Sequence, residues 1–182
     1  RRLREDDRPG AGRILAAIEK RRRDNRAEGQ RLRQMLRYER TLWANGTMLV
    51  AGVDEAGMSP LAGPVVAAAV IFAVETRIEE VDDSKRLPAD VRERLALVIK
   101  RRAACWAVGQ ASSREIDELN IYHAGLLAMR RAVLALQPQP EALLVDARVV
   151  PDTSLRQQSI VRGDQKSLSI AAASVIAKTT RD

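Results

Sequence analysis

Apolar residues in the first quarter of the chain recur at helical spacing. Leucine, isoleucine and methionine repeat every three or four positions over residues 13–43, which is the period of a helix with one buried face. The stretch RRRDNRAEGQ (residues 21–30) interrupts that spacing and predicts a break between two helices. Asn45-Gly46 is a typical turn pair and predicts a boundary. We therefore expect a helical extension over residues 1–47 and a second unit over residues 48–182.

From residue 48 onwards the pattern changes to short, almost wholly apolar runs of the kind found in buried strands. Amphipathic segments separate these runs, and Ser112 with Glu115 fits a capping box that opens a long helix running to about Leu136. The predicted strands are residues 48–54, 65–74, 104–112, 141–147 and 157–164, and the predicted helices are residues 88–102, 112–136 and 166–182. This order predicts an α/β domain in which a mixed β-sheet is flanked by helices.

Composition narrows the class of protein. With 182 residues, of which 46% are hydrophobic, the chain can bury one core of ordinary size. Its single cysteine excludes an internal disulfide and any zinc site built from cysteines, which favours a reducing compartment. No apolar run is long enough to span a bilayer and no signal peptide opens the sequence. We expect a cytoplasmic, monomeric protein with no membrane attachment.

The net charge of +7 is concentrated in the first quarter of the chain. Residues 1–47 carry 14 Arg and Lys against 7 Asp and Glu, whereas residues 48–182 carry 17 of each. A basic arm that binds a polyanion is one interpretation of this asymmetry. A solvated helical face with no binding role is the other, and the composition does not decide between them.

Three of the predicted strands end in acidic residues, namely Asp54 with Glu55, Asp146 and Asp164. An ordinary exposed strand end explains each acid singly. If the strands are neighbours, however, four carboxylates meet at one edge of the sheet, and their mutual repulsion favours a bound cation. Oxygen ligands without His or Cys indicate Mg²⁺ or Mn²⁺. The joint occurrence of the acids therefore favours a metal site.

The adjacent pair Asp54 and Glu55 raises a geometric difficulty. Neighbouring residues of a regular strand point to opposite faces, so both side chains should not reach one site. We expect the strand to end or bulge at Ala56-Gly57 and so to turn the Glu55 side chain back. Two cations about 3.5–4 Å apart would then stabilise the attacking and leaving oxygens of a phosphodiester. The basic arm would hold the rest of the polyanion.

Five motifs in this order closely resemble those of bacterial ribonuclease HII: AGVDEAGMSPLAGPVVAAAVI, DDSKRL, EIDELNIYHAGLLAMRRAV, LLVDA and SIVRGDQKSLSIAAASVIAKTTRD. The resemblance covers residues 38–182, and residues 1–47 are similar to the helical extension of some members. It implies an RNase H-like fold and an endonuclease that uses two Mg²⁺ or Mn²⁺ ions. The implied substrates are RNA–DNA hybrids and duplex DNA with embedded ribonucleotides, cut to leave a 3′-hydroxyl and a 5′-phosphate.

The resemblance also implies roles for individual residues. The four metal-binding acids of the family map onto Asp54, Glu55, Asp146 and Asp164. Contacts to the nucleic acid are implied for two further groups of residues, which are Ser84 and Lys85 in the DSK motif and Lys166, Ser167 and Lys178 after the fourth acid. In the family, Gly-Arg-Gly follows the acid pair and its backbone contacts the ribose 2′-hydroxyl. This chain has Gly57-Met58-Ser59 instead, so the charge of the arginine is absent.

The family also continues beyond the Thr-Arg-Asp segment at which this sequence stops, so we expect a fragment or a truncated reading frame. The missing part would hold a tyrosine that packs at the ribonucleotide junction. From these two departures we expect metal binding with weak or no cleavage by the 182-residue chain. The rival hypothesis is a nucleic-acid-binding protein that keeps the fold and turns over poorly. The third hypothesis is a different metal-dependent phosphotransferase with the same fold.

Overall fold

The computed structural model describes residues 9–59 and 63–182 of the chain. These residues contain a five-stranded sheet in the spatial order β3-β2-β1-β4-β5. Its strands are β1 (Val50–Ala56), β2 (Val65–Ile71), β3 (Cys105–Ala111), β4 (Ala142–Asp146) and β5 (Arg156–Ile160). The first three strands pair antiparallel, whereas β4 pairs parallel with both β1 and β5. The predicted mixed sheet flanked by helices is confirmed.

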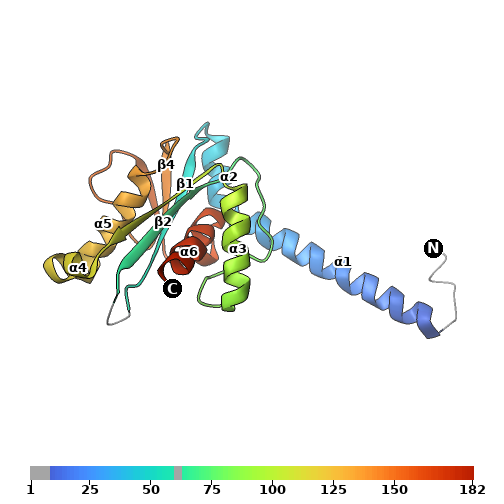
Figure 1. Cartoon of the computed structure of the whole chain (residues 1–182). Helices are drawn as coiled ribbons and strands as arrows, with labels where there is room; N and C mark the ends of the chain where they lie inside the picture. Colours follow the sequence, from blue (N-terminus) through green and yellow to red (C-terminus); the bar gives the residue numbers. More distant parts are fainter. Residues whose placement is uncertain (1–8, 60–62) are drawn as a thin grey trace.

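Helices cover both faces of this sheet (Figure 1). Those of the first face are α3 (Ala89–Arg102) and α6 (Leu168–Arg181), and those of the second are α4 (Ser113–Leu119) and α5 (Ile121–Leu134). The strands alternate between the two resulting cores: Val50 and Leu144 pack with α6, whereas Val53 and Val145 pack with α5. Because β1 and β4 are buried on both faces, any polar side chain on them lies in or beside a core.

Helix α6 approaches β1 more closely than side chains would allow. A Cβ added to Gly52 would lie 2.1 Å from the carbonyl carbon of Ser169 and 2.3 Å from the amide nitrogen of Ile170. Glycine is therefore required at this position, because any larger residue would push the helix off the strand. This contact fixes the first turn of α6 against the strand that carries Asp54 and Glu55.

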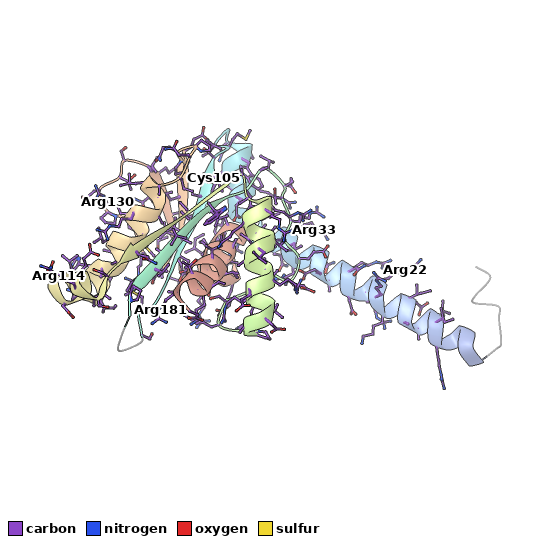
Figure 2. The ribbon with its side chains drawn as sticks, viewed as in Figure 1. Arg22, Arg33, Cys105, Arg114, Arg130 and Arg181 are labelled. Carbon is purple, nitrogen blue, oxygen red and sulfur yellow. The ribbon has the colours of Figure 1, made fainter. Side chains whose placement is uncertain are left out.

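The N-terminal region consists of α1 (Pro9–Met35) and α2 (Arg37–Ala44). Figure 1 shows α1 projecting away from the sheet, and Figure 2 shows Arg22 on the projecting part. The break expected within residues 21–30 was wrong, since α1 is continuous there and ends only at Met35. That stretch lacks proline, and seven of its ten residues are Arg, Ala, Glu or Gln, which sustain a helix without a buried face. The last turn of α1 does reach the core, where Leu32 and Met35 are buried.

Two further boundaries differ from the predictions. The single helix expected over residues 112–136 is divided at Asn120, whose φ of 68° ends α4 and whose side-chain oxygen caps α5. A positive φ is uncommon in residues other than glycine, and asparagine is among the few in which it is enriched. The predicted capping box of Ser112 and Glu115 is confirmed. The strand expected over residues 157–164 ends at Ile160, and Asp164 lies in the 3₁₀ turn η2 (Gly163–Gln165). None of the described helices is both long and apolar enough to cross a membrane.

Candidate active site

Asp54 and Asp146 come from adjacent parallel strands and lie on the same face of the sheet. The parallel register pairs Gly52 with Leu144 and Val53 with Val145, so the next step along the strands places Asp54 beside Asp146. Both carboxylates belong to the face covered by α6, because residues two positions earlier in each strand lie on that face. Asp54 is 6% exposed. The parallel pairing of β1 with β4 thus joins two acids that are 92 positions apart in the sequence.

Glu55 lies on the opposite face of β1, as strand alternation requires. The strand ends at Ala56, as expected, but it does not bulge there. The ladder with β2 stays regular to the pair Ala56 and Val66, so the Glu55 side chain is not turned back. The Oε1 atom of Glu55 lies 3.3 Å from Nε of Arg148. Its Oε2 atom is buried and has no hydrogen-bond partner among the described residues. Glu55 therefore has one oxygen engaged and one available.

Asp164 reaches this region from a turn rather than from a strand. The turn begins at Arg162, whose φ of 57° is left-handed, and the amide nitrogen of Gly163 donates to Oδ1 of Asp146 at 2.6 Å. This hydrogen bond ties the turn to the end of β4. It therefore places Asp164 near the other acids, although the strand β5 has already ended.

All four acids line one pocket of about 250 Å³ at the ends of β1 and β4. Its other lining residues are Ala56, Gly57, Met58, Ser59, Ser84, Lys85, Ser174, Lys178 and Arg181. Arg181, near the end of α6, is labelled in Figure 2. Six of the eight residues expected to contact nucleic acid are thus beside the acids. Lys85, Lys178 and Arg181 contribute positive charge beside the four acids.

The two remaining residues lie elsewhere. Ser167 is fully buried at the start of α6, where its hydroxyl caps the helix by accepting from the amide nitrogen of Ile170. Lys166 is exposed, and its Nζ donates to the carbonyl oxygen of Val161 at 2.7 Å. Within the pocket, Ser84 is also buried, and its hydroxyl shares a 2.9 Å hydrogen bond with that of Ser174. The hydroxyl of Ser84 is therefore already engaged within the protein.

Gly57 occupies a backbone position that excludes side chains. Its φ is +101°, and an added Cβ would lie 2.7 Å from both the carbonyl oxygen of Pro64 and Nε of Arg181. Met58 turns its thioether toward α5, where the sulfur would be 2.9 Å from a Cβ on Gly125. The side chain that replaces the family's arginine thus packs partly against an apolar cluster.

The acids disfavour one another's charged forms. Burial raises the pKa of Asp54 well above its ordinary value, and the charges of Glu55 and Asp146 raise it further. Burial also raises the pKa of Glu55, although the guanidinium of Arg148 opposes the rise. Burial raises the pKa of Asp164 to about 6, with contributions from Asp83 and Asp146. Asp146 is the common neighbour, because its charge acts on each of the other three acids.

This donor set fits a hard divalent cation, because it consists of carboxylate oxygens whose repulsion a cation would relieve and because one buried oxygen of Glu55 has no partner. As the side chains stand, no three acidic, histidine or cysteine residues of the described chain are grouped closely enough to hold one ion. Binding of one ion by three of these acids would therefore require side-chain movement. The salt bridge of Glu55 to Arg148 is one contact that such a movement would change.

Three residues near the acids were not identified from the sequence. Arg148 pairs with Glu55 and lies over the ring of Tyr122 at 4.9 Å. Ser174 interacts through its hydroxyl with Asp54. Asp83 is 9% exposed and contributes to the raised pKa of Asp164. A cation two residues after Asp146 could have suggested the first, but the other two depend on how the helix and loop pack.

Comparison with known proteins identifies the family. The sequence model of the ribonuclease HII family matches residues 51–182, and the sequence model of the ribonuclease HII N-terminal domain matches residues 1–43. The chain belongs to the ribonuclease HII family. Ribonuclease HII of Myxococcus xanthus is 58% identical over 178 residues, which are 97% of this chain and 61% of the relative. That of Anaeromyxobacter is 60% identical over 177 residues, which are 97% of this chain and 56% of the relative.

The chain spans about three fifths of the length of these two relatives. Solved structures agree on the fold. Ribonuclease H2 of Pyrococcus horikoshii superposes with a TM-score of 0.65 at 29% identity, over 74% of this chain and 72% of that one. The expected RNase H-like fold is therefore confirmed.

Proposed function

We propose that the protein is an endoribonuclease that hydrolyses the RNA strand of RNA–DNA hybrids and nicks duplex DNA at embedded ribonucleotides. The observation that carries this proposal is the pocket in which Asp54, Glu55, Asp146 and Asp164 meet at the ends of β1 and β4. Membership of the ribonuclease HII family supports it. Two divalent cations, Mg²⁺ or Mn²⁺, would stabilise the attacking and leaving oxygens of the scissile phosphodiester when bound.

In this proposal the chain's own residues hold the acids and the substrate in place. Asp54 and Asp146 are the central pair, with Glu55 approaching from the α5 face and Asp164 from the turn. Lys85 and Lys178 supply positive charge where a phosphate would lie. The backbone at Gly57, left open because no Cβ fits there, is the candidate contact for the ribose 2′-hydroxyl.

The test is cleavage of a DNA duplex that carries one ribonucleotide, compared with the same duplex made wholly of DNA. We expect the 182-residue chain to make a single, weak cut beside the ribonucleotide, dependent on Mg²⁺ or Mn²⁺, that leaves a 3′-hydroxyl and a 5′-phosphate. Asp146→Asn should abolish the cut, whereas Asp152→Asn should retain it, because Asp152 is an exposed acid paired with Arg130. Equal cleavage of both duplexes, or cleavage without a divalent cation, would refute the proposal.

A nucleic-acid-binding protein with poor turnover is the second candidate, and Met58 is the observation that favours it. Its thioether packs toward α5 and brings no charge to a phosphate. Under this alternative the chain binds the ribonucleotide-containing duplex without cutting it. Met58→Arg should then restore part of the cleavage, and an unmodified chain that cuts at full rate would eliminate the alternative.

We also propose that the projecting part of α1 binds polyanions and that the protein is a cytoplasmic monomer. Deleting residues 1–30 should test the first point cleanly, since Leu32, Met35 and Leu36 are buried in the core and must be kept. Loss of phosphate contacts should weaken duplex binding and flatten its dependence on salt, because fewer counterions are released. An unchanged salt slope would show that α1 is a solvated helix.

A further inference from the structure

Glu39 is a buried carboxylate on α2, outside the strands and turn that carry the acidic pocket. It is 2% exposed, and its Oε1 atom accepts three hydrogen bonds from the start of α6. The donors are the hydroxyl of Ser167 at 2.7 Å, the hydroxyl of Ser169 at 2.7 Å and the amide nitrogen of Ser169 at 3.0 Å. These contacts join residues that are about 130 positions apart in the sequence.

The contacts of Glu39 stabilise a helix terminus. The first amide groups of α6 have no partners within the helix, and the positive end of its dipole favours a nearby carboxylate. Ser167 caps the helix by accepting from the amide nitrogen of Ile170 while its own hydroxyl donates to Glu39. Glu39 therefore orients both the capping residue and the first turn of α6.

The same turn lies against the strand of Asp54. Ser169, which donates twice to Glu39, is the residue whose carbonyl carbon would lie 2.1 Å from a Cβ on Gly52. Gly52 precedes Asp54 by two residues on the same face of β1. Five residues beyond Ser169, Ser174 interacts with Asp54 and hydrogen-bonds to Ser84. Four residues further on, Lys178 lines the acidic pocket.

We propose that Glu39 is a positioning residue of the acidic pocket, acting through α6. By holding the first turn of α6 against Gly52, it sets where Ser174 meets Asp54 and where Lys178 enters the pocket. Helix α2 then contributes to the site, although all of it except Ala44 lies within the region matched by the N-terminal domain model. This inference rests on the proposed function, because it assumes that Asp54 binds a divalent cation.

The test is the affinity for Mn²⁺ measured by calorimetry on the 182-residue chain, at a temperature where every variant is folded. Glu39→Ala should weaken binding about tenfold, the lower end of what losing an outer partner of a metal ligand costs. Glu39→Gln should recover most of the affinity, because its amide oxygen can accept the same three hydrogen bonds. Ser169→Ala keeps the backbone donor of Ser169, so its Mn²⁺ affinity should fall between the affinities of Glu39→Ala and Glu39→Gln. It replaces Glu39→Ala in this test if Glu39→Ala does not fold.

Leu42→Ala is the matched control, since Leu42 is a buried apolar residue on the same helix, 5% exposed. It should lower the melting temperature and leave the Mn²⁺ affinity within about twofold of the parent, because it removes packing and no polar contact. If Glu39→Ala behaves as Leu42→Ala does, Glu39 only stabilises the fold and the inference is wrong. If the parent chain binds no Mn²⁺ at millimolar concentration, the proposed function fails and the inference falls with it.

Discussion

Two buried carboxylates contact helix α6, and their surroundings are opposite. Glu39 meets the first turn of the helix, where three donors converge on one of its oxygens. Asp54 meets the helix at Ser174, among acids whose charges disfavour its ionised form. Burial is similar, at 2% for Glu39 and 6% for Asp54. The partners therefore decide the role: donors make a buried acid structural, whereas other acids make it a site for a cation.

The largest expected change in the free energy of unfolding follows substitution of Glu39, the structural acid. Glu39→Ala leaves the hydroxyls of Ser167 and Ser169 and one amide group without their acceptor in a buried place. We expect a loss of about 3 kcal/mol of unfolding free energy, as when one partner of a buried charged group is removed. Urea denaturation of the metal-free protein measures it. A loss below about 0.5 kcal/mol, the usual effect of a surface substitution, would break the distinction between the two acids.

The next largest effect is the stabilisation of the native state by a bound cation, which depends on Asp146. A cation present at a hundred times its dissociation constant stabilises the native state by about 2.7 kcal/mol, which corresponds to roughly 5–10 °C in a chain of this size. Asp146→Asn should remove most of this shift, because the charge of Asp146 acts on the other three acids. Its amide oxygen can still accept from Gly163. Thermal melts with and without Mn²⁺ measure the difference, and Asp152→Asn should keep the full shift.

A smaller change in the free energy of unfolding, this time a gain, is expected on substitution of Asp54 in the absence of metal. Because its pKa is raised in the folded state, the stability of the parent falls as pH rises from the unfolded pKa of about 4 towards the folded value. Asp54→Asn removes this dependence and should stabilise the metal-free protein at pH 7 by about 1 kcal/mol, within the range common for stabilising substitutions. Below pH 4 the two proteins should converge. Melting in EDTA across this range tests the sign, and a less stable variant at pH 7 would contradict it.

The smallest change in stability is expected at Glu115, a partly exposed acid that serves as a reference for the two buried acids. Arg131 lowers the pKa of Glu115 to about 2, helped by the amide of Ser112 in the capping box. The stabilisation is complete above the unfolded pKa of about 4.5 and is lost as pH falls towards 2. Glu115→Gln should melt slightly below the parent at pH 7 and together with it near pH 2. Glu118→Gln, on the same helix, is the control. If the difference in melting temperature between Glu115→Gln and the parent persists at pH 2, the charge of Glu115 is not its cause.

The candidate site was predictable from the sequence to different degrees. Asp54 and Asp146 each follow an apolar run, and that pattern is sufficient to place them at the ends of buried strands. Glu55 was expected to turn back at Ala56-Gly57, where the strand does end, but its side chain approaches from the other face of a strand that stays regular to Ala56. Asp164 was assigned to a strand because Ile160 and Val161 continue the apolar run, whereas Arg162 turns the backbone into η2. The hydrophobic pattern of a sequence indicates which segments are buried, but it does not indicate where the backbone of a single residue turns.

What the sequence determined by itself is local: the strand and helix segments, the capping box at Ser112, and the acids at the ends of apolar runs. These follow from periodicity and from hydrogen bonds between residues close in the chain. Only the tertiary structure decided that β1 pairs with β4 and not another strand, which brings Asp54 to Asp146. It also decided that Glu39, unremarkable within a charged helix, caps α6 from 130 positions away. Such contacts depend on how separate elements pack, and no spacing along the chain encodes them.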